Sequence, residues 1–493
     1  MTAATLRLAP ASTSYREPSD ISFEADGHSI PSHPLRVKPL GNLLLARGPD
    51  ARAALGAWGS LPDETLMLVL EHLDQSELIT LGSTCKFLYA FCHSDELWKA
   101  IYLRLPETRS RLLEWRGSWR STVRAFPKNI ETSIDCGGVF SDILHRPFAC
   151  TNIKLSQYVR GIPKANLIPR FDNLTYDEFA ERWTEQPFIL TQCIQNWPAC
   201  SLWTLESLLR DYADVEFRAE AVDWTLRRYW SYMNDSRDES PLYLFDRKFV
   251  EKMDIKVGRD ADAAYWRPDC FGPDLLEVLG RERPAHRWLI AGPERSGSTF
   301  HKDPNGTSAW NAVIQGAKYW IMFPPAAQVP GVYVSPDSSE VTSPLSIAEW
   351  LLTFHGEARR LPGCVEGVCL AGEILHVPSG WWHLVVNLES GIAVTQNFVP
   401  VSPSLNLVSE VLSFLRDKPD QVSGFPTRVE DPYKLFVERL RAAYPDVLDR
   451  ALDLASTKGG KKRKWETAVG RNEEAEEGFS FGFGDGEDDD GVP

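Results

Sequence analysis

With 493 residues, 43% of them hydrophobic, the chain is too long for a single core, and we expect two or three domains with tails. Its formal net charge of −15 at pH 7 argues against a dominant nucleic-acid-binding surface, so we expect no direct nucleic-acid partner. No apolar run approaches the ~18 residues of a membrane-spanning helix. No charged-then-apolar leader opens the chain either, so we expect a soluble intracellular protein without a membrane partner.

The first part of the chain is predicted to form a disordered arm and a small helical domain. Residues 1–58 mix Pro, Ser, Ala and Arg without a sustained period, which is typical of a disordered or loosely held arm. From Ser60 the pattern becomes helical: a proline lies in the first turn, acidic residues follow early, and Leu66 and Leu70 recur at helical spacing. Two further helical stretches follow, so residues 59–104 are predicted to form an all-α domain.

This helical block resembles an F-box. The residues that carry the resemblance are Leu61-Pro62, the Leu-Gly-Ser-Thr-Cys-Lys run at 81–86, and Leu97-Trp98. The resemblance implies docking on the adaptor subunit of a cullin-type ubiquitin ligase, with Leu61 and Pro62 at the contact. An ordinary three-helix bundle that serves only as a packing platform is the alternative, because leucine stripes at helical spacing usually form a core.

A connecting segment and the first elements of a second domain come next. Residues 105–164 hold scattered aromatic residues among polar and glycine-containing connections, and we interpret them as the connection. A capping box formed by Thr175 and Glu178 predicts the start of a helix. Strand-like and helix-like stretches alternate after it.

The stretch from Ser298 to Asn311 contains a His-x-Asp pair, His301 and Asp303, and a further histidine, His383, follows 82 residues after the first. On an extended strand end the two side chains of such a pair project to the same side, as chelation requires. Two histidines and one carboxylate on one face are the usual ligands of an iron(II) that must also bind an organic cosubstrate and O2. An isolated His-x-Asp pair is common by chance, so the assignment of a metal site depends on the surrounding residues.

Lys318 is such a surrounding residue. It lies in a strand-like, largely apolar run from Trp310 to Phe323, where an ammonium group is costly unless it meets an anion. A dicarboxylate cosubstrate would supply that anion. His383 is predicted to open a strand after the turn at Pro378 and Gly380, which is a rigid place for a ligand.

These segments resemble a JmjC-domain 2-oxoglutarate oxygenase, in the branch of small JmjC proteins described as arginine demethylases and lysyl hydroxylases. The resemblance covers about residues 165–400. It is carried by Gly292-Pro-Glu-Arg-Ser-Gly, His301-Lys-Asp-Pro-Asn-Gly-Thr-Ser-Ala-Trp-Asn-Ala, Gly380-Trp-Trp-His-Leu-Val-Val-Asn-Leu and Thr395-Gln-Asn-Phe. It implies an α+β fold, in which a double-stranded β-helix (the jelly-roll or cupin-like barrel) with flanking helices follows the small all-α domain.

The resemblance also implies roles for individual residues. The implied iron(II) ligands are His301, Asp303 and His383. The residues implied to bind the distal carboxylate of 2-oxoglutarate are Lys318 and Thr395, and those implied to line its pocket are Asn311 and Ser298, the latter where the family often has threonine. Tyr229 aligns with a family tyrosine of the cosubstrate pocket, with Tyr232 as the alternative.

The C-terminal part is predicted to hold helices and a tail. Residues 401–455 carry Leu and Val at helical intervals and are expected to pack on the barrel; some relatives use such helices for dimerisation, which leaves a homodimer open. Residues 456–493 have too little apolar surface to fold and are predicted to be disordered. Their basic cluster, Lys458 to Lys464, predicts a nuclear-import signal and hence the nucleus, with solvated charge and a cytoplasmic pool as the alternatives.

Two functions of different class follow from these patterns. The first is an iron(II)- and 2-oxoglutarate-dependent oxygenase that uses O2 to hydroxylate, or to demethylate through hydroxylation, a lysine or arginine side chain of a protein such as a histone or an RNA-associated protein. The second is an F-box substrate receptor of a ubiquitin ligase that uses the barrel for recognition. A barrel kept only for recognition, or a metal-free cupin-like barrel, need not retain the metal triad, Lys318 and Thr395 together, so we favour the enzyme.

Overall fold

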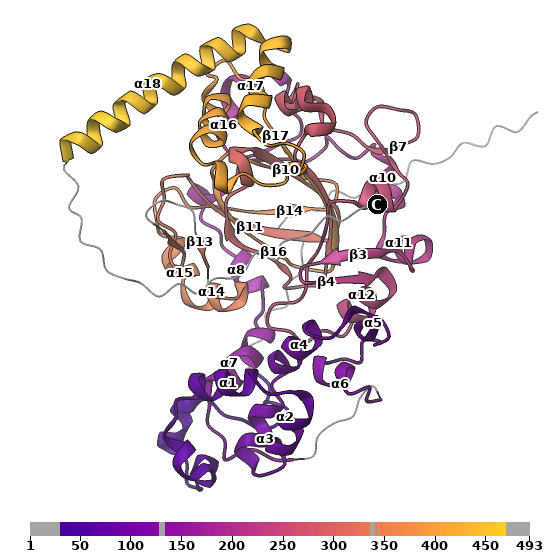
Figure 1. The fold of residues 1–493 in the computed structure, drawn as a ribbon, viewed down its shortest axis with the longest axis vertical. Coiled ribbons are helices and arrows are strands. Elements are labelled where there is room, and N and C mark those ends of the chain that lie inside the picture. The colour runs from indigo at the N-terminus through magenta and orange to yellow at the C-terminus, as the bar shows by residue number, and fades with distance from the viewer. Residues whose placement is uncertain (1–29, 128–133, 336–340, 344, 470–493) are drawn as a thin grey trace, which may run out of the picture.

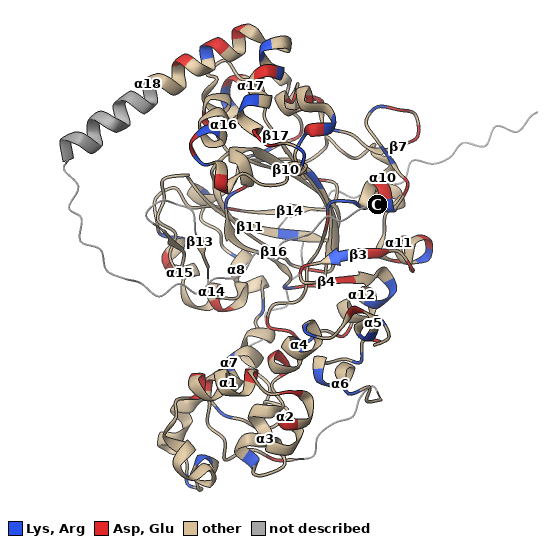
Figure 2. Cartoon of the chain, in the orientation of Figure 1, with Lys and Arg blue, Asp and Glu red and all other residues tan. Residues whose placement is uncertain are grey.

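The computed structural model describes residues 30–127, 134–335, 341–343 and 345–469. A barrel of β-strands lies at the centre of the molecule, the N-terminal helices lie beneath it, and the C-terminal helices cover its upper end (Figure 1). Charged residues are concentrated on the outer helices and loops, whereas the strands around the barrel carry few (Figure 2). None of the described helices is long and apolar enough to cross a membrane.

Four short helices form the N-terminal domain. The first, α1 (Asp63–Glu71), has two acidic residues in its first turn, and α2 (Gln75–Gly82) begins with a capping box of Asp74 and Glu77. The other two are α3 (Lys86–Cys92) and α4 (Asp95–Leu103). The apolar faces of the four helices bury Leu66, Leu70, Leu78, Phe87, Phe91 and Trp98.

Part of the N-terminal arm is ordered, unlike the disorder predicted for residues 1–58. Two 3-10 segments, η2 (Leu40–Leu45) and η3 (Ala51–Ser60), precede α1. Leu35 is buried, and its carbonyl accepts a hydrogen bond from the backbone N–H of Cys136 at 3.0 Å. This partner is distant in the sequence, so a search for local periodicity does not reveal the contact. The chain before residue 30 lies outside the described part.

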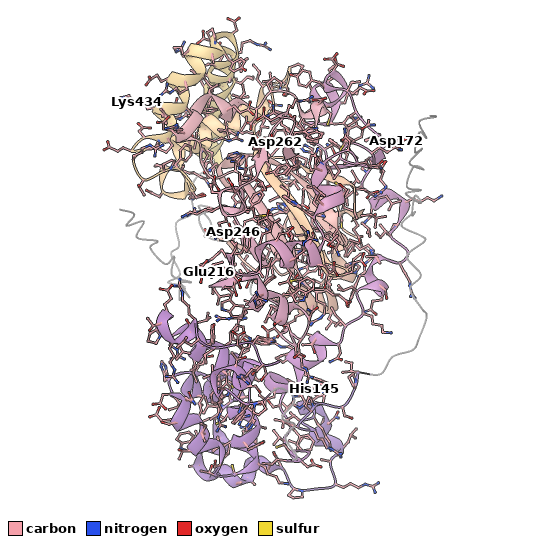
Figure 3. All side chains as sticks on the ribbon, turned by 90° about the vertical axis from the view of Figure 1, so that its right-hand side faces the viewer. His145, Asp172, Glu216, Asp246, Asp262 and Lys434 are labelled. Carbon is pink, nitrogen blue, oxygen red and sulfur yellow. The ribbon has the colours of Figure 1, made fainter. Side chains whose placement is uncertain are left out.

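The predicted connecting segment is a packed part of the molecule rather than a loose connection. Its helices are α5 (Glu107–Ser110), α6 (Trp119–Val123), α7 (Asp142–Thr151) and α8 (Ser156–Val159). Trp115 and Trp119 are buried where this segment meets the barrel domain, and both rings lie against Trp224. Glu216 of the barrel domain lies at the same junction (Figure 3), where it accepts a hydrogen bond from Arg111 at 3.2 Å.

Two sheets build the barrel. The larger has the order β1 (Arg170–Phe171), β2 (Phe188–Leu190), β15 (Ile374–Val377), β10 (Ser308–Gln315), β17 (Gly391–Phe398), β8 (Arg287–Gly292), β5 (Leu244–Asp246), β3 (Glu216–Ala219) and β4 (Val222–Thr225). The smaller has the order β14 (Val365–Leu370), β11 (Ala317–Phe323), β16 (Trp382–Asn387) and β9 (Gly297–His301). This barrel, together with the helical N-terminal domain, confirms the predicted α+β fold.

Short elements surround the barrel. The helices are α9 (Tyr176–Glu178), α10 (Pro198–Leu202), α11 (Leu205–Tyr212), α12 (Leu226–Met233), α13 (Phe249–Lys252), α14 (Ile347–Thr353) and α15 (His355–Ala358), with a π-helical turn η5 (Phe179–Trp183). The 3-10 segments are η4 (Lys164–Asn166), η6 (Asp269–Phe271), η7 (Leu275–Glu282), η8 (Pro304–Gly306) and η9 (Pro419–Gln421). Two small strand pairs are β6 (Lys256–Val257) with β7 (Ala263–Tyr265), and β12 (Tyr333–Val334) with β13 (Val341–Thr342).

Three C-terminal helices pack on η7 and on one another: α16 (Asn406–Asp417), α17 (Pro432–Ala443) and α18 (Pro445–Val469). Their shared core includes Leu276, Leu412 and Phe436. Because α18 continues to Val469, the backbone of residues 456–469 is helical where the sequence predicts a disordered tail. The acidic end of the tail lies outside the described residues.

Candidate active site

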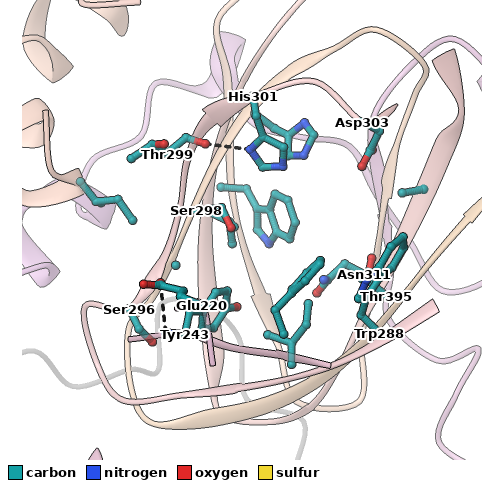
Figure 4. A pocket seen from close by; sticks show the side chains of 18 of the residues that line it. Glu220, Tyr243, Trp288, Ser296, Ser298, Thr299, His301, Asp303, Asn311 and Thr395 are labelled. Carbon is teal, nitrogen blue, oxygen red and sulfur yellow. Dashed lines mark hydrogen bonds between the residues drawn. The ribbon is translucent and has the colours of Figure 1, made fainter. Parts of the chain in front are cut away.

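A cavity of about 720 Å³ opens in the barrel. His301 and Asp303 lie at one end of it, Tyr243 lies at the other, and Ser298 lies between them (Figure 4). The wall contains residues of β9, β10, β16 and β17, so segments that are far apart in the sequence face one space.

The three predicted metal ligands are brought together at one end of this cavity. His301 ends β9, Asp303 follows two residues later, and His383 lies on β16 directly opposite His301 in the antiparallel register. One ligand atom from each of the three lies within 4.8 Å of the others. A single ion can therefore reach all three side chains.

Both histidines are oriented by the backbone of their own segments. Nδ1 of His301 lies 2.7 Å from the carbonyl oxygen of Thr299, and Nδ1 of His383 lies 3.0 Å from that of Trp381. A carbonyl oxygen can only accept, so each Nδ1 carries the proton and each Nε2 keeps a free lone pair. This tautomer is the one that a histidine needs to bind a metal through Nε2.

Asp303 completes the arrangement. Its Oδ1 accepts a hydrogen bond from Nδ2 of Asn397 at 3.4 Å, while its buried Oδ2 has no partner. Burial raises the pKa of Asp303 to about 6, although the nearby His301 opposes this shift. Burial and then the proximity of His301 hold the pKa of His383 well below its usual value. A buried carboxylate oxygen without a donor, beside two imidazoles that each present Nε2, fits a divalent cation.

A local irregularity of β9 lets both Ser298 and His301 face the cavity. The pairing of β9 with β16 shifts register between His301 and Ser298, so these residues share a wall although they are three apart. Gly297 permits the close approach of the two strands, because a Cβ there would lie 2.0 Å from the carbonyl oxygen of Val385. The spacing of β9 and β16, and with it the distance between the two histidines, depends on this glycine.

Lys318 on β11 lies behind the other end of the cavity and is not itself part of the wall; Tyr243 stands between its ammonium and the cavity. The lysine side chain is only 2% exposed, and its ammonium donates a hydrogen bond to the hydroxyl of Tyr243, which lines the cavity in front of it. Burial lowers the pKa of Lys318 to about 7. No carboxylate pairs with it among the described residues, so an anion is the partner that this buried cation lacks.

Thr395 and Asn311 lie side by side near this end, because the register of β17 and β10 pairs them directly. The Thr395 hydroxyl donates to the carbonyl oxygen of Trp310 at 3.0 Å. The side-chain Oδ1 of Asn311 is buried without a partner. Both residues line the cavity, where the sequence places them.

Comparison with known proteins decides what this barrel is. The family model of the cupin-like domain matches residues 178–403, and the F-box-like model matches residues 58–104. Arginine-specific demethylase JMJ22 of Arabidopsis thaliana is 38% identical over 437 residues, which cover 85% of this chain and 83% of that protein. The chain belongs to the JmjC oxygenase family.

Two other relatives are also named as demethylases, hydroxylases or oxygenases. Bifunctional arginine demethylase and lysyl-hydroxylase psr-1 of Caenorhabditis elegans is 34% identical over 325 residues, 62% of this chain and 76% of that protein. The 2-oxoglutarate and iron-dependent oxygenase JMJD4 of Danio rerio is 31% identical over 185 residues, 35% of this chain and 40% of that protein. These findings confirm the predicted family, the barrel fold and the enzyme class.

The tyrosine proposed from the JmjC resemblance does not line the cavity. The Tyr229 hydroxyl is buried, lies 2.8 Å from the carbonyl oxygen of Leu242 and accepts from the backbone N–H of Leu244 at 3.0 Å. The alternative, Tyr232, is equally buried and is absent from the cavity wall. The structure places Tyr243 there instead, because α12 directs its tyrosines into the core and the following segment returns along the barrel mouth.

Sequence reasoning also missed Asn397, which belongs to the Thr395-Gln-Asn-Phe segment. Its side-chain amide donates to Asp303 and, at 2.9 Å, to the hydroxyl of Thr307. It therefore orients the carboxylate of the triad from a neighbouring strand. Strand alternation supplies the missing signal, since residues 395 and 397 of one strand face the same side.

Proposed function

We propose that the protein is an iron(II)- and 2-oxoglutarate-dependent oxygenase that hydroxylates, or demethylates through hydroxylation, an arginine or lysine side chain of a protein. The observation that carries this proposal is a metal-fitting triad at one end of a cavity whose other end, at Tyr243, is backed by a buried lysine without a carboxylate partner among the described residues. The names of JMJ22 and psr-1 support the substrate class, since both proteins are named for action on arginine or lysine side chains.

His301, Asp303 and His383 would hold the iron on one face, each histidine through Nε2. When bound, iron, 2-oxoglutarate and O2 together supply the oxidising power that inserts oxygen into a C–H bond of the substrate. Three protein ligands leave positions open for the cosubstrate and O2. The carbonyls behind the two histidines keep the rings fixed, so the protein's part in the chemistry is to hold this geometry.

Lys318, Tyr243 and Thr395 would bind the distal carboxylate of 2-oxoglutarate. The lysine ammonium contributes charge, and the Tyr243 hydroxyl, which accepts from the lysine, keeps its own proton to donate to the carboxylate. The Thr395 hydroxyl would have to turn its proton from the carbonyl of Trp310 to the carboxylate. Bound there, the carboxylate would provide the anion that the buried lysine lacks. Asn311 and Ser298 would line the space between the two ends.

Part of the cavity wall suits a cationic substrate. Glu220 and Glu239 line the cavity, where they also accept hydrogen bonds from the Tyr243 backbone at 3.1 Å and the Ser346 hydroxyl at 2.6 Å, respectively. The rings of Phe245 and Trp288 on the same wall stack with their centroids 5.3 Å apart. Carboxylates bind guanidinium and ammonium groups, and aromatic faces attract them. Of the two arginines on the wall, Arg218 is paired with Asp223 at 2.8 Å, and Arg295 donates to the carbonyl of Asp238 at 3.1 Å.

Succinate release by the purified full-length protein tests the proposal. The assay contains iron(II), 2-oxoglutarate and matched peptides with arginine, N-methylarginine, lysine or N-methyllysine at one position. We expect peptide-dependent succinate release together with either oxygen addition to the peptide or formaldehyde release, which separates hydroxylation from demethylation. Absence of all peptide-dependent turnover, with iron bound, would reject the proposed substrate class.

A role as an F-box receptor is the second candidate, favoured by the match of residues 58–104 and by the surface around Leu61 and Pro62. Pro62 is exposed, and Leu68 and Val69 on α1 are also exposed instead of facing the helical core. We expect the purified cullin-ligase adaptor to be recovered with the wild type and lost with the double variant Leu61→Ala/Pro62→Ala. The control is Leu112→Ala, an 81% exposed leucine outside this surface. Equal recovery with both variants would leave the helices as a scaffold only.

Nuclear localisation and dimerisation through the C-terminal helices stay predictions. The first rests on the basic cluster of 458–464, and the second on the helices predicted from residues 401–455, which some relatives use for dimerisation. A fluorescent fusion with its lysines replaced in that cluster tests the first. Light scattering of the purified protein tests the second.

A further inference from the structure

The segment that presents Tyr243 to Lys318 is held by two tyrosines of α12. The hydroxyl of Tyr232 accepts from the backbone N–H of Leu242 at 2.7 Å. The hydroxyl of Tyr229 accepts from the backbone N–H of Leu244 at 3.0 Å and lies 2.8 Å from the carbonyl of Leu242. The two tyrosine hydroxyls of α12 therefore hold the backbone on both sides of Tyr243.

One of these tyrosines is itself held by Asp238. The Tyr232 hydroxyl donates to Oδ2 of Asp238 at 2.7 Å. The Asp238 side chain is buried, and the indole N–H of Trp119 donates to the same carboxylate at 3.0 Å. The Asp238 carbonyl also accepts from Arg295, which lines the cavity. A buried carboxylate with few donors is sensitive to the loss of any of them.

Trp119 lies outside the barrel domain, on α6, and its position depends on the F-box-like domain. The side chain of Asp95, at the start of α4, accepts from the backbone N–H of Trp119 at 3.1 Å and from that of Arg120 at 2.9 Å. The Trp119 ring packs against Tyr102 of α4 with centroids 5.2 Å apart. An unbroken series of hydrogen bonds thus runs from the F-box-like domain through Trp119, Asp238 and Tyr232 to the segment of Tyr243.

We propose that Trp119 and Asp238 are positioning residues for the cosubstrate, through which the F-box-like domain holds Tyr243 against Lys318. The affinity of the oxygenase for 2-oxoglutarate then depends on the F-box-like domain. This domain would contribute to cosubstrate binding in addition to its proposed docking role. The inference rests on the proposed function, because Lys318 and Tyr243 are its binding site for the distal carboxylate. The metal end has no such connection, so iron affinity should be independent of Trp119.

The test compares two tryptophan substitutions in the full-length protein. Trp119→Phe removes the indole N–H and keeps most of the ring in the core. Trp224→Phe is the matched control, because its indole N–H donates at 2.9 Å to the hydroxyl of Tyr102 across the same junction but has no bond to the Tyr243 segment. Both variants lose a buried indole hydrogen bond at the junction, to a carboxylate in Trp119→Phe and to a neutral hydroxyl in Trp224→Phe.

Five quantities are measured for each variant: the melting temperature, the dissociation constant for Mn(II), the dissociation constant for 2-oxoglutarate with Mn(II) in place of iron, and kcat and KM in turnover. We expect Trp119→Phe to weaken 2-oxoglutarate binding and to raise its KM by about tenfold, with Mn(II) affinity and kcat little changed. Trp224→Phe should lower the melting temperature less, because its lost bond is to a neutral hydroxyl, and leave 2-oxoglutarate binding as in the wild type. A purely structural role of Trp119 predicts a lower melting temperature without a specific loss of 2-oxoglutarate affinity.

Unchanged 2-oxoglutarate binding in Trp119→Phe, or an equal change in Trp224→Phe, would overturn the inference. Lys318→Ala in the same experiment separates this failure from a failure of the proposed function. If Lys318→Ala weakens 2-oxoglutarate binding and Trp119→Phe does not, only the inference fails; if neither does, the cosubstrate site itself is wrong. Should Trp119→Phe not yield folded protein, Asp238→Asn tests the same link with the same outcomes, since it keeps the size of the side chain and removes its charge.

Discussion

The two ends of the cavity are built in different ways. At the metal end each histidine is oriented by a carbonyl two residues earlier in its own chain segment, and the two histidines face each other on adjacent strands. At the cosubstrate end Lys318 meets Tyr243 from 75 residues away, and the segment of Tyr243 is held by Asp238, whose donor Trp119 lies 119 residues from it. The histidines of the metal end are oriented locally, with Asn397 as the one distant residue described there, whereas the cosubstrate end depends on the packing of separate parts of the chain.

This difference predicts that the two ends respond differently to substitution. Changes at the metal end should act only through the ligands and their immediate neighbours. Single substitutions at the cosubstrate end should each weaken 2-oxoglutarate binding only in part, because several groups together position one carboxylate. The largest effect is therefore expected at the metal end.

Removal of the carboxylate ligand should abolish turnover. We expect Asp303→Ala to lower iron-dependent succinate release by more than about a hundredfold, because loss even of a group that orients a ligand typically costs 10- to 100-fold. The metal-free fold should survive, since the buried carboxylate has one unpartnered oxygen and its removal relieves a desolvation cost. Circular dichroism and the melting temperature check the fold. Wild-type succinate release by this variant would contradict the triad assignment.

Removal of the lysine should act on the cosubstrate and not on the metal. Lys318→Ala should raise the KM for 2-oxoglutarate by roughly 10- to 100-fold, the value of a lost charge-assisted hydrogen bond, and leave iron affinity unchanged. Lys302→Ala is the control for the loss of a lysine, because its ammonium donates to the carbonyl of Pro325 at 3.0 Å and not to Tyr243. Titrations of iron and of 2-oxoglutarate decide the matter. An equal loss of affinity for both would mean that the two ends are not independent.

The smallest expected effect is a proton taken up when the cosubstrate binds. Burial lowers the pKa of Lys318 to about 7, so at pH 8 the lysine of the cosubstrate-free protein is mostly neutral, and a bound carboxylate would raise this pKa. Calorimetry of 2-oxoglutarate binding to the Mn(II) protein, in buffers of different ionisation enthalpy, should show net proton uptake at pH 8 and little at pH 6. A heat of binding that is the same in all buffers at pH 8 would argue against this lysine as the partner of the carboxylate.

The lowered pKa of Lys318 also determines how the stability of the folded protein changes with pH. Between about pH 7 and pH 10.5 the unfolded chain carries a proton on Lys318 that the folded, cosubstrate-free protein lacks. The free energy of unfolding contributed by this group therefore rises with pH across that window. Lys318→Met should flatten this part of the pH profile, measured by denaturant unfolding.

The contrast between the two ends also explains what the sequence could predict. The triad was accessible because His301 and Asp303 form a short motif, and Lys318 because a cation in an apolar strand is conspicuous. The structure places Tyr229 in the core and Tyr243 on the cavity wall, which the sequence could not distinguish, since several tyrosines lie close together and only packing decides which hydroxyl faces the cavity. Leu35 and its ordered surroundings were missed for the same reason, as their contacts are distant in the chain.

The metal centre depends on Gly297, although this glycine is not one of the proposed metal ligands. Any side chain there would collide with the carbonyl of Val385 and force β9 away from β16, which would separate His301 from His383. A variant with a larger residue at this position would retain every chemical group of the triad and still lose the distance between them. A screen of natural variants that inspects only His301, Asp303 and His383 would therefore score such a protein as active when its iron site is broken.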